Sequence, residues 1–254
     1  MSYYFTLALV LFLYMTGWFC LSVVKKRNDV ADIAWGLGFV LLAWAAMAMT
    51  QITLRGLMVN ALVAVWGIRL ALHIWQRNKK KQEDYRYANW RKEWGKLFYL
   101  RSYLEVYLLQ GLFLFLIVQP VVFIHNSPNQ AFTLLDGVGL VVWAIGFYFE
   151  SVGDRQLKEF IANPANKGKL IETGLWRYSR HPNYFGEITQ WWGLFVIALS
   201  LPGAVLTVIG PVTITVLILF VSGVPLLENK YAGRPDFEEY KRKTSVFIPL
   251  PPRR

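Results

Sequence analysis

Long apolar runs constrain this chain more than any other feature of its sequence. The first, "YYFTLALVLFLYMTGWFCLSVV" at 3–24, contains no charged residue, and further runs of this kind follow along the chain. An α-helix rises 1.5 Å per residue, so about 20 apolar residues cross the roughly 30 Å of hydrocarbon in a bilayer. Since 55% of the residues are hydrophobic and only 17% are charged, we expect an all-α, polytopic membrane protein.

The apolar runs predict a bundle of about seven transmembrane helices. We place them at 3–24, 31–50, 56–76, 104–124, 132–152, 186–201 and 203–225. The first run lacks a basic n-region and a small-residue cleavage site, so we expect a retained helix rather than a signal peptide. The single cysteine, Cys20, rules out an intramolecular disulfide framework. We expect residues 1–254 to form a single membrane-embedded domain.

The basic residues indicate how the helices are oriented. The loops 25–30, 77–103 and 153–185, with the tail from 226, hold 25 of the 27 Lys and Arg residues. Cytoplasmic loops carry the excess of Lys and Arg in membrane proteins. We therefore expect the N-terminus outside and the C-terminus in the cytoplasm. Because topology accounts for the net charge of +11, we expect no nucleic-acid partner.

Polar residues cluster near the cytoplasmic ends of the predicted helices. Those in or beside the spans are Asp29, Asp32, Arg69, His73, Glu150, Asp154, Asn183, Tyr184 and Glu187. The outer half offers only Asn60, Glu105, Gln110 and Asp136, scattered near loop edges. Polar groups inside a membrane are costly and often mark functional sites. Taken singly, each could be structural; together they predict one site open to the cytoplasm rather than a path through the bilayer.

The residue types in this cluster suit a large polar ligand. Arg177 and Arg180 carry planar guanidinium groups that match phosphates. Asn183 can donate to and accept from an amide, and Glu150 or Asp154 can accept from ribose hydroxyls. The sequence has no G-x-G-x-x-G, no P-loop and no Cys/His spacing for a metal. We therefore expect a bound organic cofactor and no metal.

The segment 83–103, "EDYRYANWRKEWGKLFYLRSY", is basic, aromatic and amphipathic. Such a pattern is typical of a helix that lies on the membrane surface. We favour this interpretation, on the cytoplasmic leaflet, over a lid above the substrate.

Two segments carry a resemblance to a known family. "GLWRYSRHPNYFGE" (174–187) and "ENKYAGRPDFEEYKRKTSVFIP" (228–249) resemble the steroid 5-alpha-reductase family, in particular a bacterial branch of it. The likeness extends to "RNDVADIAWGLGF" (27–39) and "FESVGDRQLKEF" (149–160). The "RHPNY" element and the tail are shared with membrane sterol reductases and isoprenylcysteine carboxyl methyltransferases. The resemblance implies a seven-helix bundle, a cytoplasmic NADPH cavity with lateral access for lipid, and a bacterial inner membrane.

The resemblance also implies which residues bind the cofactor. The family's Asn-x-x-x-Asp element reads here as Glu150 to Asp154, and its Asn-x-x-Gly-Glu element as Asn183, Gly186 and Glu187. Arg69 matches an arginine on the third family helix. We expect the cofactor-binding half of the domain at approximately 132–254. Together with two residues before it, the expected cofactor-binding residues are Arg69, His73, Glu150, Asp154, Arg177, Arg180, His181 and Asn183.

The chain departs from the family where the substrate ketone is held. The steroid reductases use a Gln-Glu pair near the start of their second helix together with a Tyr. This chain has "DVADIAW" in that region, and Trp66 stands where the Tyr would be. We expect Asp32 to replace the missing group, with Tyr178 or Tyr184 as proton donor and Glu187 as a further catalytic residue.

These observations predict reduction of an activated carbon–carbon double bond in a lipid-soluble, steroid- or isoprenoid-like substrate by hydride from NADPH. The enolate oxygen that develops needs a hydrogen-bond donor aimed at it. The expected partners are this lipophilic small molecule and membrane lipid. Two alternatives stay open: methyl transfer from S-adenosylmethionine, and a non-catalytic lipid-binding bundle. The sequence specifies neither the substrate nor the oligomeric state.

Overall fold

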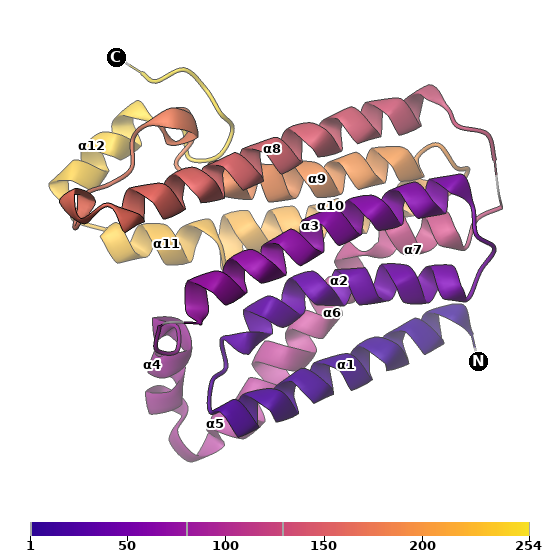
Figure 1. The fold of residues 1–254 in the computed structure, drawn as a ribbon, viewed down its shortest axis with the longest axis horizontal. Coiled ribbons are helices and arrows are strands. Elements are labelled where there is room, and N and C mark those ends of the chain that lie inside the picture. The colour runs from indigo at the N-terminus through magenta and orange to yellow at the C-terminus, as the bar shows by residue number, and fades with distance from the viewer. Residues whose placement is uncertain (1, 80, 129, 254) are drawn as a thin grey trace. The chain divides into compact units, whose positions relative to one another are not determined.

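The computed structural model describes residues 2–79, 81–128 and 130–253. Apart from short loops, these residues are helical (Figure 1). In chain order the helices are α1 (Tyr3–Lys25), α2 (Val30–Ala48), α3 (Leu54–Asn78), α4 (Tyr85–Trp94), η1 (Gly95–Leu97), α5 (Phe98–Arg101), η2 (Ser102–Leu108), α6 (Leu109–Ile117), α7 (Gln119–His125), α8 (Leu134–Ala162), η3 (Pro164–Asn166), η4 (Gly174–Arg177), α9 (Pro182–Ala198), η5 (Ala204–Val208), α10 (Ile209–Val216), η6 (Leu217–Val221), α11 (Val224–Tyr231) and α12 (Pro235–Lys243). No strand occurs in the described ranges, so the all-α fold class is confirmed.

The structure supports a multi-pass membrane protein. Within the described residues, six helices are long and apolar enough to cross a bilayer: Tyr3–Lys25, Val30–Ala48, Leu54–Asn78, Tyr85–Ile117, Leu134–Ala162 and Ala204–Tyr231. The span expected at 186–201 forms as α9, which has only 17 residues. Its length of about 26 Å is at the lower limit for crossing the hydrocarbon.

Prolines explain why several boundaries differ from the expected ones. Pro182 occupies the first turn of α9, where its fixed φ suits a helix start and its missing N–H is not needed. The helix therefore begins four residues earlier than expected. Pro120 likewise opens α7, so the span expected at 104–124 ends at Ile117 in the structure.

The chain divides into two compact units, residues 1–132 and 133–254. In unit 1, α2 and α3 pack side by side at two glycines. A Cβ atom on Gly36 would lie 2.7 Å from the carbonyl oxygen of Gly67, and one on Gly67 would lie 2.5 Å from that of Gly36. Only glycine permits this approach of two backbones.

Unit 2 is organised by an equally close contact between α8 and α9, which run side by side (Figure 1). Gly139 and Gly146 on α8 meet Gly193 and Gly186 on α9, each pair seven residues from the next. A Cβ atom on Gly139 would lie 2.6 Å from the Gly193 carbonyl oxygen, and one on Gly146 would lie 2.6 Å from that of Gly186. This contact brings the polar ends of the two helices together.

The N-terminus of α8 explains one polar residue that lies away from the predicted site. Thr133 caps the helix, and its backbone N–H donates to Asp136 Oδ2 at 2.7 Å in a capping box. Such a cap satisfies backbone donors that the first turn leaves unpaired. Asp136 therefore has a structural role.

Candidate functional site

The segment 174–187 lies against the C-terminal half of α8, where α9 begins. Gly174 has a φ of +62°, which glycine adopts without strain. The next residue, Leu175, donates its backbone N–H to Gln156 Oε1 at 2.9 Å. Trp176 Nε1 donates to the carbonyl oxygen of Gly153 at 3.1 Å. These contacts hold the following polar residues next to α8.

Two acid–amide pairs connect α8 and α9. Asn183 Nδ2 donates to Asp154 Oδ1 at 3.1 Å, and Gln190 Nε2 donates to Glu150 Oε2 at 2.5 Å. Glu150 is only 3% exposed and Gln190 only 1%. Gln190 Oε1 is buried and has no hydrogen-bond partner in the described structure. An unsatisfied buried acceptor of this kind needs an explanation, and a ligand with an N–H group is one.

A third acid, Glu228 on α11, joins two of the predicted residues. Its Oε1 atom accepts from Arg180 Nε at 2.8 Å and lies 3.1 Å from His181 Nε2. The His181 ring stacks on Tyr184, with ring centroids 5.5 Å apart and planes 13° apart. Glu228 therefore orients the imidazole and, through it, the tyrosine ring.

Arg180 has an internal role. Its side chain is buried, and besides Glu228 it donates from Nη1 to the carbonyl oxygens of Thr244 at 2.6 Å and Lys241 at 3.4 Å. Its backbone N–H donates to the carbonyl oxygen of Ser245 at 2.9 Å. These partners occupy the guanidinium group that we expect to bind phosphate. Of the predicted arginine pair, Arg177 is the exposed member.

The C-terminal tail is fastened along the same loop. Ser179 Oγ donates to the carbonyl oxygen of Phe247 at 2.8 Å. The backbone N–H of Leu250 donates to the carbonyl oxygen of Tyr178 at 3.0 Å. The Tyr240 hydroxyl donates to the carbonyl oxygen of Trp176. Burial raises the pKa of Tyr240 above its ordinary value, so the phenol remains a donor at neutral pH.

The other predicted residues of unit 2 lie on the accessible side of this network. Tyr178 is 42% exposed, and Tyr184 and Glu187 are half-buried on the first turns of α9 beside Asn183. The structure thus gathers Asp154, Asn183 and the His181–Tyr184 stack at one end of the α8–α9 pair.

Asp32 lies in unit 1 and accepts from several donors. Its carboxylate accepts from Arg86 Nη2 at 2.9 Å and from the Tyr87 hydroxyl at 2.7 Å, and it lies 3.8 Å from Arg77 Nη2. Arg86 also donates to Asp84. Burial alone would raise the pKa of Asp84, but the hydrogen bond and charge of Arg86 outweigh it and lower that pKa. In this arrangement Asp32 is an acceptor, and Tyr87 is the hydroxyl donor beside it.

Three further residues from the sequence prediction lie on α3 in unit 1. Arg69 and His73 are half-buried, one turn apart. Trp66 is 2% exposed and packs edge-on against Phe39, with ring centroids 5.3 Å apart. The residue that replaces the family's tyrosine is therefore part of the core of unit 1.

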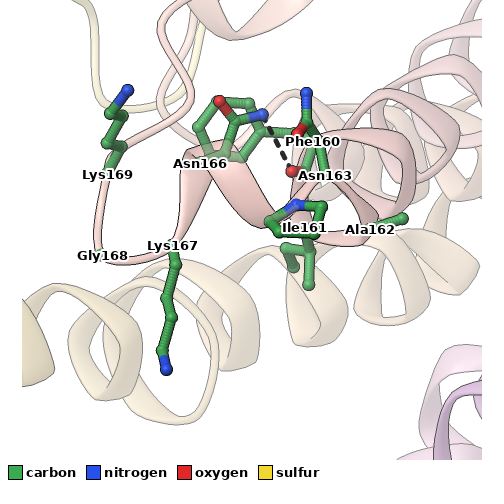
Figure 2. Close-up of a pocket in the computed structure, with 9 residues that line it drawn as sticks. Phe160, Ile161, Ala162, Asn163, Asn166, Lys167, Gly168 and Lys169 are labelled. Atoms are coloured by element: carbon green, nitrogen blue, oxygen red, sulfur yellow. Dashed lines mark hydrogen bonds between the residues drawn. The ribbon is translucent and has the colours of Figure 1, made fainter.

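Among the described residues, no three His, Cys, Asp or Glu side chains lie together in a way that could hold a metal ion. The described part of the chain contains a cavity of about 360 Å³ at the C-terminal end of α8 (Figure 2). The lining residues are Phe160, Ile161, Ala162, Asn163, Pro164, Asn166, Lys167, Gly168 and Lys169. Asn166 Nδ2 donates to the carbonyl oxygen of Phe160 at 3.0 Å, which closes the loop on itself (Figure 2).

The sequence prediction omitted Gln190 and Glu228. Gln190 could have been found as the amide that follows Asn183 by two helical turns inside an apolar run. Glu228 opens the quoted segment 228–249, but no feature of the sequence shows that it pairs with Arg180 and His181. Glu228 and His181 are 47 positions apart in the chain, so local sequence patterns do not indicate that they are in contact.

Comparisons with known proteins give one family and one relative. The family model described as "Protein of unknown function (DUF1295)" matches residues 18–244. The chain is 27% identical over 169 residues to the uncharacterized protein C594.04c of Schizosaccharomyces pombe, which covers 58% of this chain and 49% of that protein. The matched region thus spans about half the length of this relative. No solved structure matches the chain.

Proposed function

The chain belongs to the DUF1295 family, and from this premise we propose that it is an NADPH-dependent membrane reductase. The proposed reaction is reduction of an activated carbon–carbon double bond in a steroid- or isoprenoid-like lipid. The family includes steroid 5-alpha-reductase-like proteins, which agrees with the resemblance of 174–187 and 228–249. A bacterial inner membrane is the proposed location.

The observation that carries the proposal is the polar end of the α8–α9 pair. Asp154 and Asn183 lie in contact there, with an acceptor and a donor that suit ribose hydroxyls and amides. Deeper between the helices, Gln190 Oε1 is an acceptor without a partner. The –NH₂ group of a nicotinamide carboxamide is the partner that we propose for this acceptor. Asp154, Asn183 and Gln190 are therefore the residues that we propose to hold the nicotinamide nucleotide.

The cavity at the end of α8 favours a dinucleotide over S-adenosylmethionine. Ile161 lines the cavity and follows Asp154 by seven residues on the same helix, or about 10 Å along its axis. A dinucleotide is long enough to extend from Asp154 to this cavity, whereas S-adenosylmethionine has no pyrophosphate and no second nucleotide. Lys167 and Lys169 extend from the cavity loop on different sides (Figure 2), and either could neutralise a phosphate.

In the proposed reaction NADPH, when bound, supplies the hydride to the β-carbon of the double bond. Asp154, Asn183 and Gln190 orient the nucleotide. Tyr184 offers a hydroxyl to the developing enolate oxygen, and His181 and Glu228 limit its movement. Tyr178, which is exposed in the same unit, is the further candidate donor. Removing a donor aimed at a developing oxyanion typically lowers the rate by about 100-fold or more.

Thermal unfolding of the detergent-purified protein tests the cofactor directly. We expect NADPH at a hundred times its Kd to add about 2.7 kcal/mol to the free energy of unfolding. Asp154→Ala and Asn183→Ala should abolish this stabilisation. Asn229→Ala, which replaces an exposed amide of the same unit, should retain it.

The outcomes separate the alternatives. Stabilisation by S-adenosylmethionine alone would refute the reductase and favour a methyltransferase, since the "RHPNY" element also occurs in the isoprenylcysteine methyltransferases. No stabilisation by NADPH, NADH or S-adenosylmethionine would favour a non-catalytic lipid-binding bundle. If NADPH does stabilise the protein, the oxidation of NADPH in the presence of an enone lipid is measured next. Loss of this oxidation in Tyr184→Phe would identify Tyr184 as the proton donor.

A further inference from the structure

Two loops of unit 1 that are far apart in the sequence are fastened together. Arg27 Nη1 donates to the carbonyl oxygen of Lys81 at 3.0 Å, and Arg91 Nη2 donates to that of Lys26 at 3.3 Å. The backbone N–H of Asn28 donates to Glu83 Oε1 at 2.6 Å. Figure 1 shows α4 and α5 at the end of the unit where α1 ends and α2 begins. The α1–α2 connection and the segment after α3 therefore form one surface.

The arginines of this surface point inward and pair with its acids. Arg27 binds Asp29 through two hydrogen bonds of 3.0 and 2.7 Å, and Arg91 binds Glu83 through two of 3.2 and 2.9 Å. Arg86 bridges Asp84 and Asp32, both at 2.9 Å. The planar guanidinium suits these double contacts. Three arginines thus pair with four carboxylates at this end, and a fourth arginine, Arg77, has its Nη2 atom 3.8 Å from Asp32 Oδ2.

The lysines of the same surface point outward. Six of the described lysines here are exposed, and one of them, Lys79, has its Nζ atom 4.7 Å from the centre of the Trp75 ring. We name the other five the lysine rim: Lys25, Lys26, Lys81, Lys92 and Lys96. No salt bridge joins any of the five to an acid within the described part of the chain. Glu93 is the exposed acid nearest to them in the sequence. The rim therefore presents a clear excess of positive charge.

Exposed apolar side chains adjoin the rim. Tyr85, Leu97, Tyr99 and Leu100 are 45%, 58%, 46% and 57% exposed. They belong to the helical stretch Tyr85–Ile117, which is apolar enough to enter the bilayer. A band of tyrosines and leucines beside lysines is typical of the boundary between hydrocarbon and lipid headgroups.

The arginines of this surface pair with its acids, whereas the lysines of the rim are exposed and form no salt bridge among the described residues. We therefore propose that the lysine rim binds the headgroups of anionic phospholipids. Lysine is a compact charge on a flexible stem, which suits mobile headgroups better than fixed double contacts. The internal ion pairs keep the nearby acids from repelling the lipid phosphates. Bound anionic lipid holds the α1–α2 connection and the α4–α5 segment at the membrane surface. This interaction is independent of the proposed reductase activity.

The test compares lipids of equal chain length and different charge. The protein in neutral detergent receives phosphatidylglycerol or phosphatidylcholine at equal mole fractions, and the midpoint of thermal unfolding is measured. We expect phosphatidylglycerol to raise the midpoint more, with an affinity that falls about fivefold for each lysine replaced. The difference should vanish at high salt, because exposed charges are screened.

Variants assign the effect to the lysine rim. The rim variant replaces all five lysines by glutamine, and a milder variant replaces only Lys92 and Lys96, so that a folded protein is tested in either case. A matched control removes the same charge from unit 2 by changing five exposed residues to glutamine: Lys158, Lys230, Lys241, Arg242 and Lys243.

The proposal predicts loss of the phosphatidylglycerol effect in the rim variant, partial loss in the milder variant, and retention in the control. An equal response of wild type and rim variant would overturn it. Inorganic phosphate at the same concentration should leave the midpoint unchanged. A phosphate response as large as the lipid response would show a site for soluble anions and would overturn the lipid assignment.

Discussion

Replacing Glu228 by glutamine removes one negative charge and keeps the shape of the side chain. In the structure a single oxygen, Oε1, receives Arg180 Nε at 2.8 Å and faces His181 Nε2 at 3.1 Å. The exposures of these three side chains are 17% for Glu228, 9% for Arg180 and 6% for His181. Water can therefore replace the lost charge only in part.

The size of the effect follows from these two contacts. A hydrogen bond to a charged group contributes about 1 kcal/mol more than a neutral one, so Glu228→Gln should lower the free energy of unfolding by about 2 kcal/mol. Glu228→Ala leaves a buried guanidinium without its carboxylate and should cost about 3–5 kcal/mol. For a protein of this size, 2 kcal/mol corresponds to a fall in Tm of about 4–8 °C.

Thermal unfolding in neutral detergent, followed by tryptophan fluorescence, measures this series. Glu238→Gln is the matched control, because Glu238 is 50% exposed and pairs with Lys241 at 3.4 Å; its loss should cost less than about 0.5 kcal/mol. In an Arg180→Met background the Glu228→Gln cost should shrink by about 1 kcal/mol, since the partner is gone. Equal Tm values for Glu228→Gln and Glu238→Gln would refute the reasoning.

Three further predictions address the helix contact, pH and the tail. Gly186→Ala should destabilise the protein by more than about 3 kcal/mol, because its Cβ would overlap the α8 backbone; Gly137→Ala, which has open space, should be neutral or stabilising by thermal unfolding. Burial lowers the pKa of His125 from 6.5 to about 4, so the unfolded state alone binds a proton between these values. The free energy of unfolding should therefore fall by up to about 3 kcal/mol as the pH drops from 6.5 to 4, and a His125→Gln variant with the same pH profile would contradict this. Tyr240→Phe should cost about 1–2 kcal/mol and speed proteolysis of the tail, because the buried carbonyl of Trp176 loses its donor; unchanged cleavage would contradict it.

Much of the fold could be predicted from the sequence, because it depends on local properties. The uncharged run at 3–24 is long enough to span a bilayer wherever it is placed, and it forms α1 at Tyr3–Lys25. Backbone hydrogen bonds have no water to pair with in hydrocarbon, so an apolar run of that length must be helical. Boundaries were less predictable, as the early start of α9 at Pro182 shows.

The sequence indicates candidate residues for the site but not the contacts that they make. Asp154 and Asn183 were both expected to bind the cofactor, and the structure adds that one donates to the other. Arg180 was expected to bind phosphate, but whether its guanidinium faces a ligand or the protein depends on Glu228, which is 48 residues away in the chain.

The sequence by itself determined the class of molecule, because its apolar runs are long enough to make membrane helices. Only the tertiary structure decided which polar groups satisfy each other. A buried donor pairs with an acceptor that is near in space, and the close α8–α9 contact, which is seen only in the folded chain, sets that distance. Gln190 and Glu228 therefore join the site only once the chain is folded.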